Sequence, residues 1–199
     1  MTIVFRQDSK RNTYQIWVQE QPSSCAIASI WMARSLAKQM SFAESEWELA
    51  WRVYREVVVG MPAAFSSTAW ATPAPLCLDS RGTTGDQSTF RNMFANFGTY
   101  AKQVVQALRS DGLRATHASA PLDPTKLSQT TPAIILLGWY AQQPDGTLKR
   151  NGGHFIVAAT RNGNRVVLLD PWDGTLSEQP NSSIYQSNGL YEEIVYVSQ

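Results

Sequence analysis

Two side chains of this sequence could form a thiol–imidazole pair, a combination that attacks carbonyl carbon atoms. The chain has only two cysteines, Cys25 and Cys77, and two histidines. A thiol is a good nucleophile as the thiolate, and a helix N-terminus beside an imidazole favours that form. Cys25 follows Ser24, a good N-cap residue, at the start of a helical pattern, so it meets the first condition. Cys77 lies between two leucines in a proline-rich stretch and is expected to be an ordinary buried thiol.

The histidine expected to pair with Cys25 is His154. His117 lies inside a strand-like segment with no small residues around it, which is typical of a structural histidine. His154 follows Asn-Gly-Gly and opens an apolar strand, where small residues let a ligand approach the backbone closely. Gly153 is therefore a candidate substrate-binding residue. A histidine that merely follows a turn is the alternative reading of His154.

Two more residues could complete a catalytic centre. Asp170 ends an apolar strand and could accept the imidazole N–H and fix its tautomer. The alternative for Asp170 is to cap the turn that Pro171 begins. Gln19 stands six residues before Cys25. Its amide could donate to the oxygen that becomes negative in a tetrahedral intermediate, alongside the Cys25 backbone N–H. Gln21 competes for that role.

The order Gln19, Cys25, His154, Asp170 resembles the papain-like superfamily of cysteine peptidases. Within it, the bacterial branch of double-glycine leader peptidases of bacteriocin exporters is the nearest by resemblance. The matching segments are Gln-Glu-Gln-Pro-Ser-Ser-Cys-Ala-Ile-Ala-Ser-Ile, Gly-Gly-His-Phe-Ile-Val and Leu-Leu-Asp-Pro-Trp-Asp-Gly. Trp172 is similar to the family tryptophan that shields the histidine's hydrogen bond from water, and with Gly153 it is expected to border the substrate.

One departure from that branch concerns the residues beside the cysteine. Ser24 and Ala26 flank Cys25, whereas an acidic residue and a glycine are common in those positions of the branch. Residues 60–110 match no family pattern, so substrate identity does not follow from the resemblance.

The resemblance implies hydrolysis of peptide bonds through an acyl-enzyme, with small residues or glycine before the cut. The same triad would also serve a peptidoglycan amidase, a deamidase, or an acyl or γ-glutamyl transferase, and an inactive papain-like binding module is a further alternative. No cofactor is expected, and no metal site, because two histidines and two separated cysteines lack ligand spacing.

The elements that must position these residues fall into a helical N-terminal half and a strand-rich C-terminal half. Helical patterns cover residues 25–40, 41–58, 86–97 and 99–110, with Ser41 and Glu44 as the capping pair of the second. Strand patterns cover 113–118, 133–140, 154–160, 165–169 and 192–197, and turns are expected at 144–146, 151–153 and 162–164. This order predicts an α+β, papain-like fold, with the nucleophile's helix packed on an antiparallel sheet. We expect one domain over 1–199, with a long loop or insertion at 60–88.

The triad places a condition on the hairpin that joins its last two members. A two-residue turn at Asn162-Gly163 would set His154 opposite Pro171 and turn Asp170 to the other face of the sheet. An odd-length loop, or a bulge in one strand, restores a shared face. The sequence therefore predicts such an irregularity, and a regular two-residue turn would argue against the triad.

Composition and charge restrict the partners. A hydrophobic content of 43% supports a packed core, and a net charge of +1 gives no reason to expect nucleic acid or an anionic membrane. No apolar run is long enough to span a bilayer, and the first residues lack a signal-peptide pattern. We expect a soluble protein, either cytoplasmic or exported into a target cell by a signal-independent secretion system. Besides a protein or peptide substrate, size and family suggest a bacterial toxin or effector with a cognate inhibitor or immunity protein.

Overall fold

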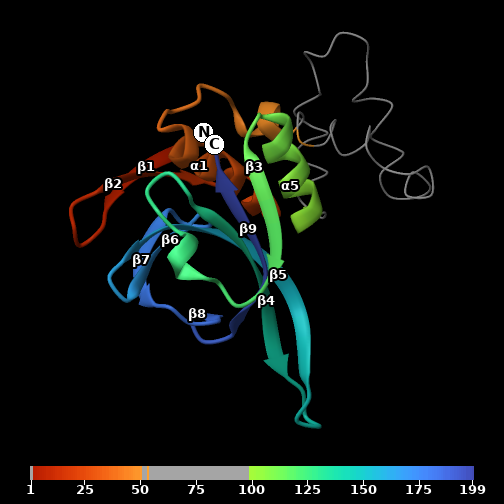
Figure 1. Ribbon diagram of the computed structural model, residues 1–199. Coiled ribbons are helices and arrows are strands. Elements are labelled where there is room, and N and C mark those ends of the chain that lie inside the picture. Colours follow the sequence, from red (N-terminus) through yellow and green to blue (C-terminus); the bar gives the residue numbers. More distant parts are fainter. Residues whose placement is uncertain (1, 51–52, 54–98) are drawn as a thin grey trace, which may run out of the picture.

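A large antiparallel sheet with helices packed on it forms the body of the molecule (Figure 1). The computed structural model describes residues 2–50, 53 and 99–199. The seven-stranded sheet has the order β3-β9-β4-β5-β6-β7, with β8 beside β9. Its strands are β3 Arg114–Ser119, β4 Ala133–Gln142, β5 Leu148–Asn162, β6 Arg165–Asp170, β7 Thr175–Pro180, β8 Ile184–Tyr185 and β9 Gly189–Ser198.

The chain begins with a separate antiparallel hairpin, β1 Thr2–Gln7 and β2 Thr13–Val18. This hairpin was not expected, since the sequence predicted a helical N-terminal half. The turn between the strands is organised by Asp8, whose buried carboxylate accepts hydrogen bonds from the backbone N–H groups of Lys10 and Asn12 and from the Tyr14 hydroxyl. Because β2 runs straight into residues 19–24, the hairpin fixes where the loop before Cys25 begins.

Helix α1, Cys25–Lys38, starts at the residue that the sequence predicts. It is buried on nearly all sides between β2 and the sheet, where β5 is its main neighbour. Trp31 packs edge-on against Trp17 of β2, with ring centroids 5.0 Å apart. Ser24 is the N-cap residue by position, but its hydroxyl makes no capping bond to the helix. That hydroxyl bonds back to Gln21 instead.

The second helix begins at residue 46, so the predicted start at Ser41 is wrong by five residues. Ser45 and Glu48 form the capping pair in place of Ser41 and Glu44, with bonds in both directions between side chain and backbone. The end of this helix, the predicted helix 86–97, the proposed loop 60–88 and Cys77 lie outside the described residues. Helix α5, Ala101–Ser110, agrees with the predicted helix 99–110.

All five predicted strands are present, but β5 is much longer than expected. It starts at Leu148, so residues 151–153 lie within a strand and the predicted turn there is wrong. Ladder pairing to β4 continues over this stretch, from Gly138 opposite Gly153 to Gln142 opposite Leu148. The ends of β4 and β5 therefore project from the sheet as a two-stranded arm (Figure 1).

The sheet carries a hydrophobic cluster on each face. Alternate residues of β4 and β5 divide between them, because successive side chains of a strand point to opposite faces. The first cluster includes Ile134, Val157 and much of α1, and the second includes Ile135 and Ile156. The predicted α+β arrangement, with the helix of Cys25 packed on an antiparallel sheet, is thus the observed one.

Candidate active site

His154 and Asp170 meet on one face of the sheet. The imidazole Nε2 and Asp170 Oδ1 are 2.7 Å apart, and each residue is only 6% exposed. The connection between β5 and β6 has two residues, Gly163 and Asn164, since Asn162 pairs with Arg165.

A bulge in β5 sets this shared face. The register between β5 and β6 shifts between Ala158 and Thr160, so Val157 pairs with Leu169 instead of facing Asp170. One extra residue in β5 turns every side chain before it to the opposite face relative to β6. The predicted irregularity between His154 and Asp170 is confirmed, and it takes the form of a bulge in place of an odd-length loop.

Asp170 is held by two donors besides the imidazole. The Trp172 backbone N–H donates to Oδ1 at 2.8 Å, and the buried Tyr185 hydroxyl donates to Oδ2 at 2.7 Å. Burial alone would raise the pKa of Asp170, but the bond and charge of His154 and these two donors lower it below its usual value. Tyr185 was not predicted from the sequence, since it lies in β8, a strand of two residues without a pattern of its own.

Cys25 approaches the same imidazole from the N-terminus of α1 and is 7% exposed. Burial by itself lowers the pKa of His154, but hydrogen bonds to Asp170 and to Cys25, together with their charges, raise it to about 9. Because Nε2 is occupied by Asp170, Nδ1 is the ring nitrogen left for the thiol. A buried imidazole that keeps its proton near neutral pH is the partner a thiolate needs.

The thiol and the imidazole reach each other from opposite faces of the sheet. Cys25 belongs to the cluster on the α1 face, whereas His154 lies two residues before Ile156 of the second cluster and so points to that cluster's face. The β5–β6 ladder begins only at Val157, so His154 lies beyond its end. The Gln19 backbone N–H donates to Pro171 O at 2.8 Å and joins the cysteine loop directly to the turn after Asp170.

Gln19 lies at the start of that loop, but its side-chain amide is already engaged. Its Nε2 donates to Gln21 O at 2.7 Å and to Pro22 O at 3.2 Å. In this arrangement the amide does not offer a free N–H to an oxyanion beside Cys25. The role predicted for Gln19 stays a prediction. Gln21, its competitor, contributes its backbone groups to the loop.

A cavity of about 380 Å³ opens in front of the imidazole. It is lined by Pro22, Trp139, Gly153, His154, Asp170, Trp172 and Gln186. The Trp172 ring stands edge-on to His154 at 6.3 Å between centroids and is 61% exposed. The Trp139 ring lies nearly parallel to the imidazole at 6.4 Å. Trp139 was not predicted from the sequence, where it reads as one more apolar residue of a buried strand.

The predicted substrate-binding residues both border this cavity. A side chain at Gly153 would bring its Cβ to 3.2 Å from the Leu137 carbonyl oxygen, so the position favours glycine and leaves its backbone accessible. His117, the other histidine, lies exposed on β3 at the far edge of the sheet and pairs with Glu193. Its structural interpretation agrees with this placement.

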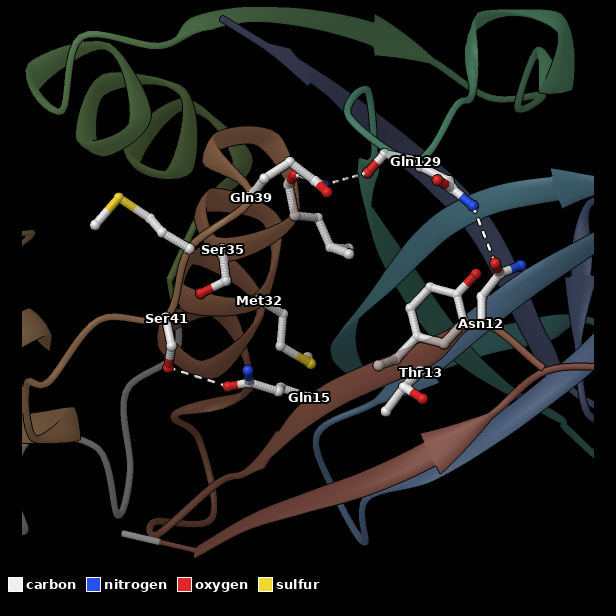
Figure 2. A pocket seen from close by; sticks show the side chains of 11 residues that line it. Asn12, Thr13, Gln15, Met32, Ser35, Gln39, Ser41 and Gln129 are labelled. Carbon is white, nitrogen blue, oxygen red and sulfur yellow. Dashed lines mark hydrogen bonds between the residues drawn. The ribbon is translucent and has the colours of Figure 1, made fainter.

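A second cavity of similar volume lies between β2 and the C-terminal half of α1 (Figure 2). Its rim is rich in neutral amides, and the Gln39 side chain bonds to Gln129 O while the Gln129 side chain bonds to Asn12. None of the predicted site residues lines it.

Within the described residues, no three His, Cys, Asp or Glu side chains are grouped to hold a metal ion. No helix in that part of the chain has the length and apolar character needed to cross a membrane.

Comparison with known proteins connects this geometry to solved structures. No protein-family model matches the sequence, and no curated protein matches it significantly. The peptidase domain of Streptococcus ComA, a bi-functional ABC transporter involved in a quorum-sensing pathway, superposes with a TM-score of 0.50 at 13% sequence identity, over 94% of this chain and 99% of that one. A double-glycine-motif protease from an AMS/PCAT transporter, solved with its leader peptide, gives a TM-score of 0.48 at 16% identity, over 100% and 99% of the two chains. The chain therefore has the papain-like fold of the ComA peptidase domain, which confirms at the level of fold the resemblance found in the sequence.

Proposed function

We propose that this chain is a cysteine peptidase in which Cys25 is the nucleophile, His154 transfers the proton and Asp170 orients the imidazole. The observation that carries the proposal is the buried series of contacts from thiol to imidazole to carboxylate, of which the imidazole and the carboxylate line an open cavity. A histidine held between a thiol and a hydrogen-bonded aspartate has the arrangement of an activated nucleophile. The ComA-like fold is compatible with this chemistry.

In the first step the Cys25 thiolate attacks the carbonyl carbon of the scissile peptide bond. The carbonyl π electrons move to oxygen, which becomes an oxyanion. As the first residue of α1, Cys25 has a backbone N–H without an intrahelical partner, and this N–H can stabilise the negative oxygen. The imidazolium of His154 then gives its proton to the leaving nitrogen as the C–N bond breaks. The products of this step are a free amine and a thioester on Cys25.

In the second step water hydrolyses the thioester. Neutral His154 removes a proton from the water, whose oxygen attacks the thioester carbon, and the C–S bond breaks to restore the thiolate. Asp170 stays ionised and keeps the ring oriented throughout. Gln19 could contribute a second donor to the oxyanion after its amide turns away from the carbonyls of Gln21 and Pro22.

The cavity favours small residues next to the bond that is cut. Trp139 and Trp172 flank the imidazole, and Gly153 has no side chain to separate the substrate from the strand. Because an indole lies on either side of the His154 ring, little room is left there for a branched side chain of the substrate. This agrees with the preference for glycine or another small residue that the sequence resemblance implies.

The test is to incubate the full chain with a mixture of defined peptides in ¹⁸O-labelled water and to identify products by mass spectrometry. We expect new C-termini that carry ¹⁸O, mostly after glycine or alanine, and no products with Cys25→Ala. Products joined to an added amine would indicate a transferase, and glutamine converted to glutamate would indicate a deamidase. In a parallel incubation with peptidoglycan fragments, cleavage of the fragments and of none of the peptides would indicate an amidase. If wild type and Cys25→Ala give the same products, the proposal is wrong.

The effector role and the cognate inhibitor expected from the sequence stay predictions. Each becomes testable once a cleaved protein is known, because an inhibitor must cover the cavity in front of His154.

A further inference from the structure

A buried carboxylate lies behind the loop that leads into Cys25. Glu46 is 0% exposed, and its Oε2 accepts a hydrogen bond from the backbone N–H of Glu20 at 2.6 Å. A charged group is seldom buried so completely without a specific role. The proposed mechanism does not use Glu46.

The same carboxyl group also interacts with Ser24, at the other end of the loop. The Ser24 hydroxyl has one hydrogen and two acceptors within reach, the Glu46 carboxylate and Gln21 O, which lies 3.1 Å away. Gln21 O already receives Ser24 N–H and the Gln19 amide, although a carbonyl oxygen has only two lone pairs. While the hydroxyl points at Gln21, Glu46 Oε1 is buried without a partner.

We propose that Glu46 is a positioning residue: its ionised carboxylate holds both ends of the loop from Glu20 to Ser24 and so fixes Cys25 and its backbone N–H. Gln19 immediately precedes this loop and Cys25 immediately follows it, so one side chain sets the spacing between them. This inference rests on the proposed function, because it concerns the placement of the nucleophile. When Glu46 is protonated it no longer attracts the Ser24 hydrogen as strongly, and the loop is held less firmly.

The pKa of Glu46 lies in a pH range where the reactivity of Cys25 can be followed. Burial raises its pKa to about 7, while the Ser24 hydroxyl and the Glu20 N–H oppose that rise and the Glu20 carboxylate adds to it. Glu48, in the first turn of the same helix, is exposed and is bonded to Ser45 instead. Glu48→Gln is therefore a matched control that removes a carboxylate from the same helical turn.

The experiment measures alkylation of Cys25 by iodoacetamide from pH 5 to pH 9, with Cys77 as internal reference and mass mapping to separate the two. In wild type we expect the Cys25 rate constant to rise about threefold through pH 7, an effect the size of one modest hydrogen bond. Glu46→Gln should abolish this increase in the rate constant through pH 7, and Glu48→Gln should retain it. The inference is overturned if the increase in rate persists in Glu46→Gln. It is also overturned if the rate falls as Glu46 ionises, because that is the result expected if the negative charge of Glu46 only disfavours the thiolate.

If Glu46→Gln does not fold, the same alkylation profile measured on Ser24→Ala tests the inference. Loss of the hydroxyl that lowers the Glu46 pKa should move the midpoint of the rate increase above pH 7. An unchanged midpoint overturns the inference.

The proposed function and the role of Glu46 fail in different ways. If wild-type Cys25 reacts no faster than Cys77 at pH 6, the proposed function and the inference fall together. If Cys25 reacts fast but its pH profile does not depend on Glu46 or Ser24, only the inference fails.

Discussion

The thiol side and the imidazole side of the candidate active site are built in different ways. The thiol side consists of one short loop and the first residue of α1, held from behind by the side chain of Glu46. The imidazole side draws on three strands, with His154 from β5, Asp170 from β6 and Tyr185 from β8. On the thiol side, residues close in sequence make most of the contacts. On the imidazole side, the bonds from His154 and Tyr185 to Asp170 join separate strands, and only the Trp172 N–H comes from a neighbour in the sequence.

This difference separates activation from placement. In the proposed mechanism the hydrogen bonds around Asp170 keep the proton on His154, and so the imidazole side sets the chemistry of the thiol. The loop before Cys25 sets only where the thiol and its N–H lie. Substitutions on the imidazole side should therefore have larger effects on reactivity than substitutions on the thiol side, Cys25 itself excepted.

The largest effect is expected from His154→Ala. Without an imidazolium beside it, Cys25 loses the partner that favours its thiolate and should react as an ordinary cysteine. We expect its alkylation at pH 6.5 to slow by about 100-fold, measured by mass mapping. His117→Ala, on the far edge of the sheet, is the matched control and should leave the rate unchanged. Equal rates for wild type and His154→Ala would show that the imidazole side does not activate the thiol.

The next largest effect concerns the source of the imidazole's proton affinity. Asp170→Asn removes the negative charge and keeps the shape, so burial should bring the pKa of His154 down from about 9 by about one unit or more. The measurement is NMR titration of the imidazole C–H signals, with His117 as internal reference. Asp173→Asn, in the turn that follows Asp170, removes an exposed carboxylate and should leave the pKa of His154 unchanged. If the pKa of His154 stays at about 9 in Asp170→Asn, its rise is caused by Cys25 and not by Asp170.

The two sides should also lose stability in different pH windows. Burial raises the pKa of Glu46 from 4.5 to about 7, and the bonds to Asp170 and Cys25 raise that of His154 from 6.5 to about 9 against the effect of burial. Both groups bind a proton more tightly in the folded state. Their stabilisation is complete below the ordinary pKa and is lost as the pH rises through the folded value.

We therefore expect the free energy of unfolding to fall by roughly 3 kcal/mol between pH 4.5 and 7, and by a similar amount between pH 6.5 and 9. Urea unfolding at several pH values measures both. Glu46→Gln should remove the first decrease and keep the second. If the first decrease persists in Glu46→Gln, the buried carboxyl on the thiol side is not its source.

The smallest effect is expected from Tyr185→Phe. Asp170 Oδ2 would lose its hydroxyl donor and remain buried, which costs about 1–3 kcal/mol of stability. For a chain of this size that lowers the melting temperature by about 2–4 °C per kcal/mol. The His154–Asp170 bond stays in place, so Cys25 alkylation should change little. Tyr191→Phe, a buried tyrosine of the same cluster that is not bonded to Asp170, is the control. A large loss of reactivity in Tyr185→Phe would show that Asp170 depends on its third donor.

Sequence patterns predicted the helix that begins at Cys25, the five principal strands and the α+β class. These features depend on local periodicity and on the residue types at the ends of elements, which a single segment displays. The N-terminal hairpin was missed because its short strands do not alternate cleanly: Ile16 and Trp17 are adjacent and both buried. The turn at 151–153 was wrong because pairing with β4 holds the two glycines in a strand.

By itself, the sequence determined which residues could act, because two histidines and two cysteines allow few pairings and the helical pattern marks Cys25. It also determined that a triad required an irregular hairpin, since side chains alternate along strands. Only the tertiary structure decided that the irregularity is a bulge in β5, that Tyr185 and Trp139 join the site, and that Glu46 lies behind the cysteine loop. Each of these depends on which distant segments pack together, and single-segment patterns carry no record of that packing.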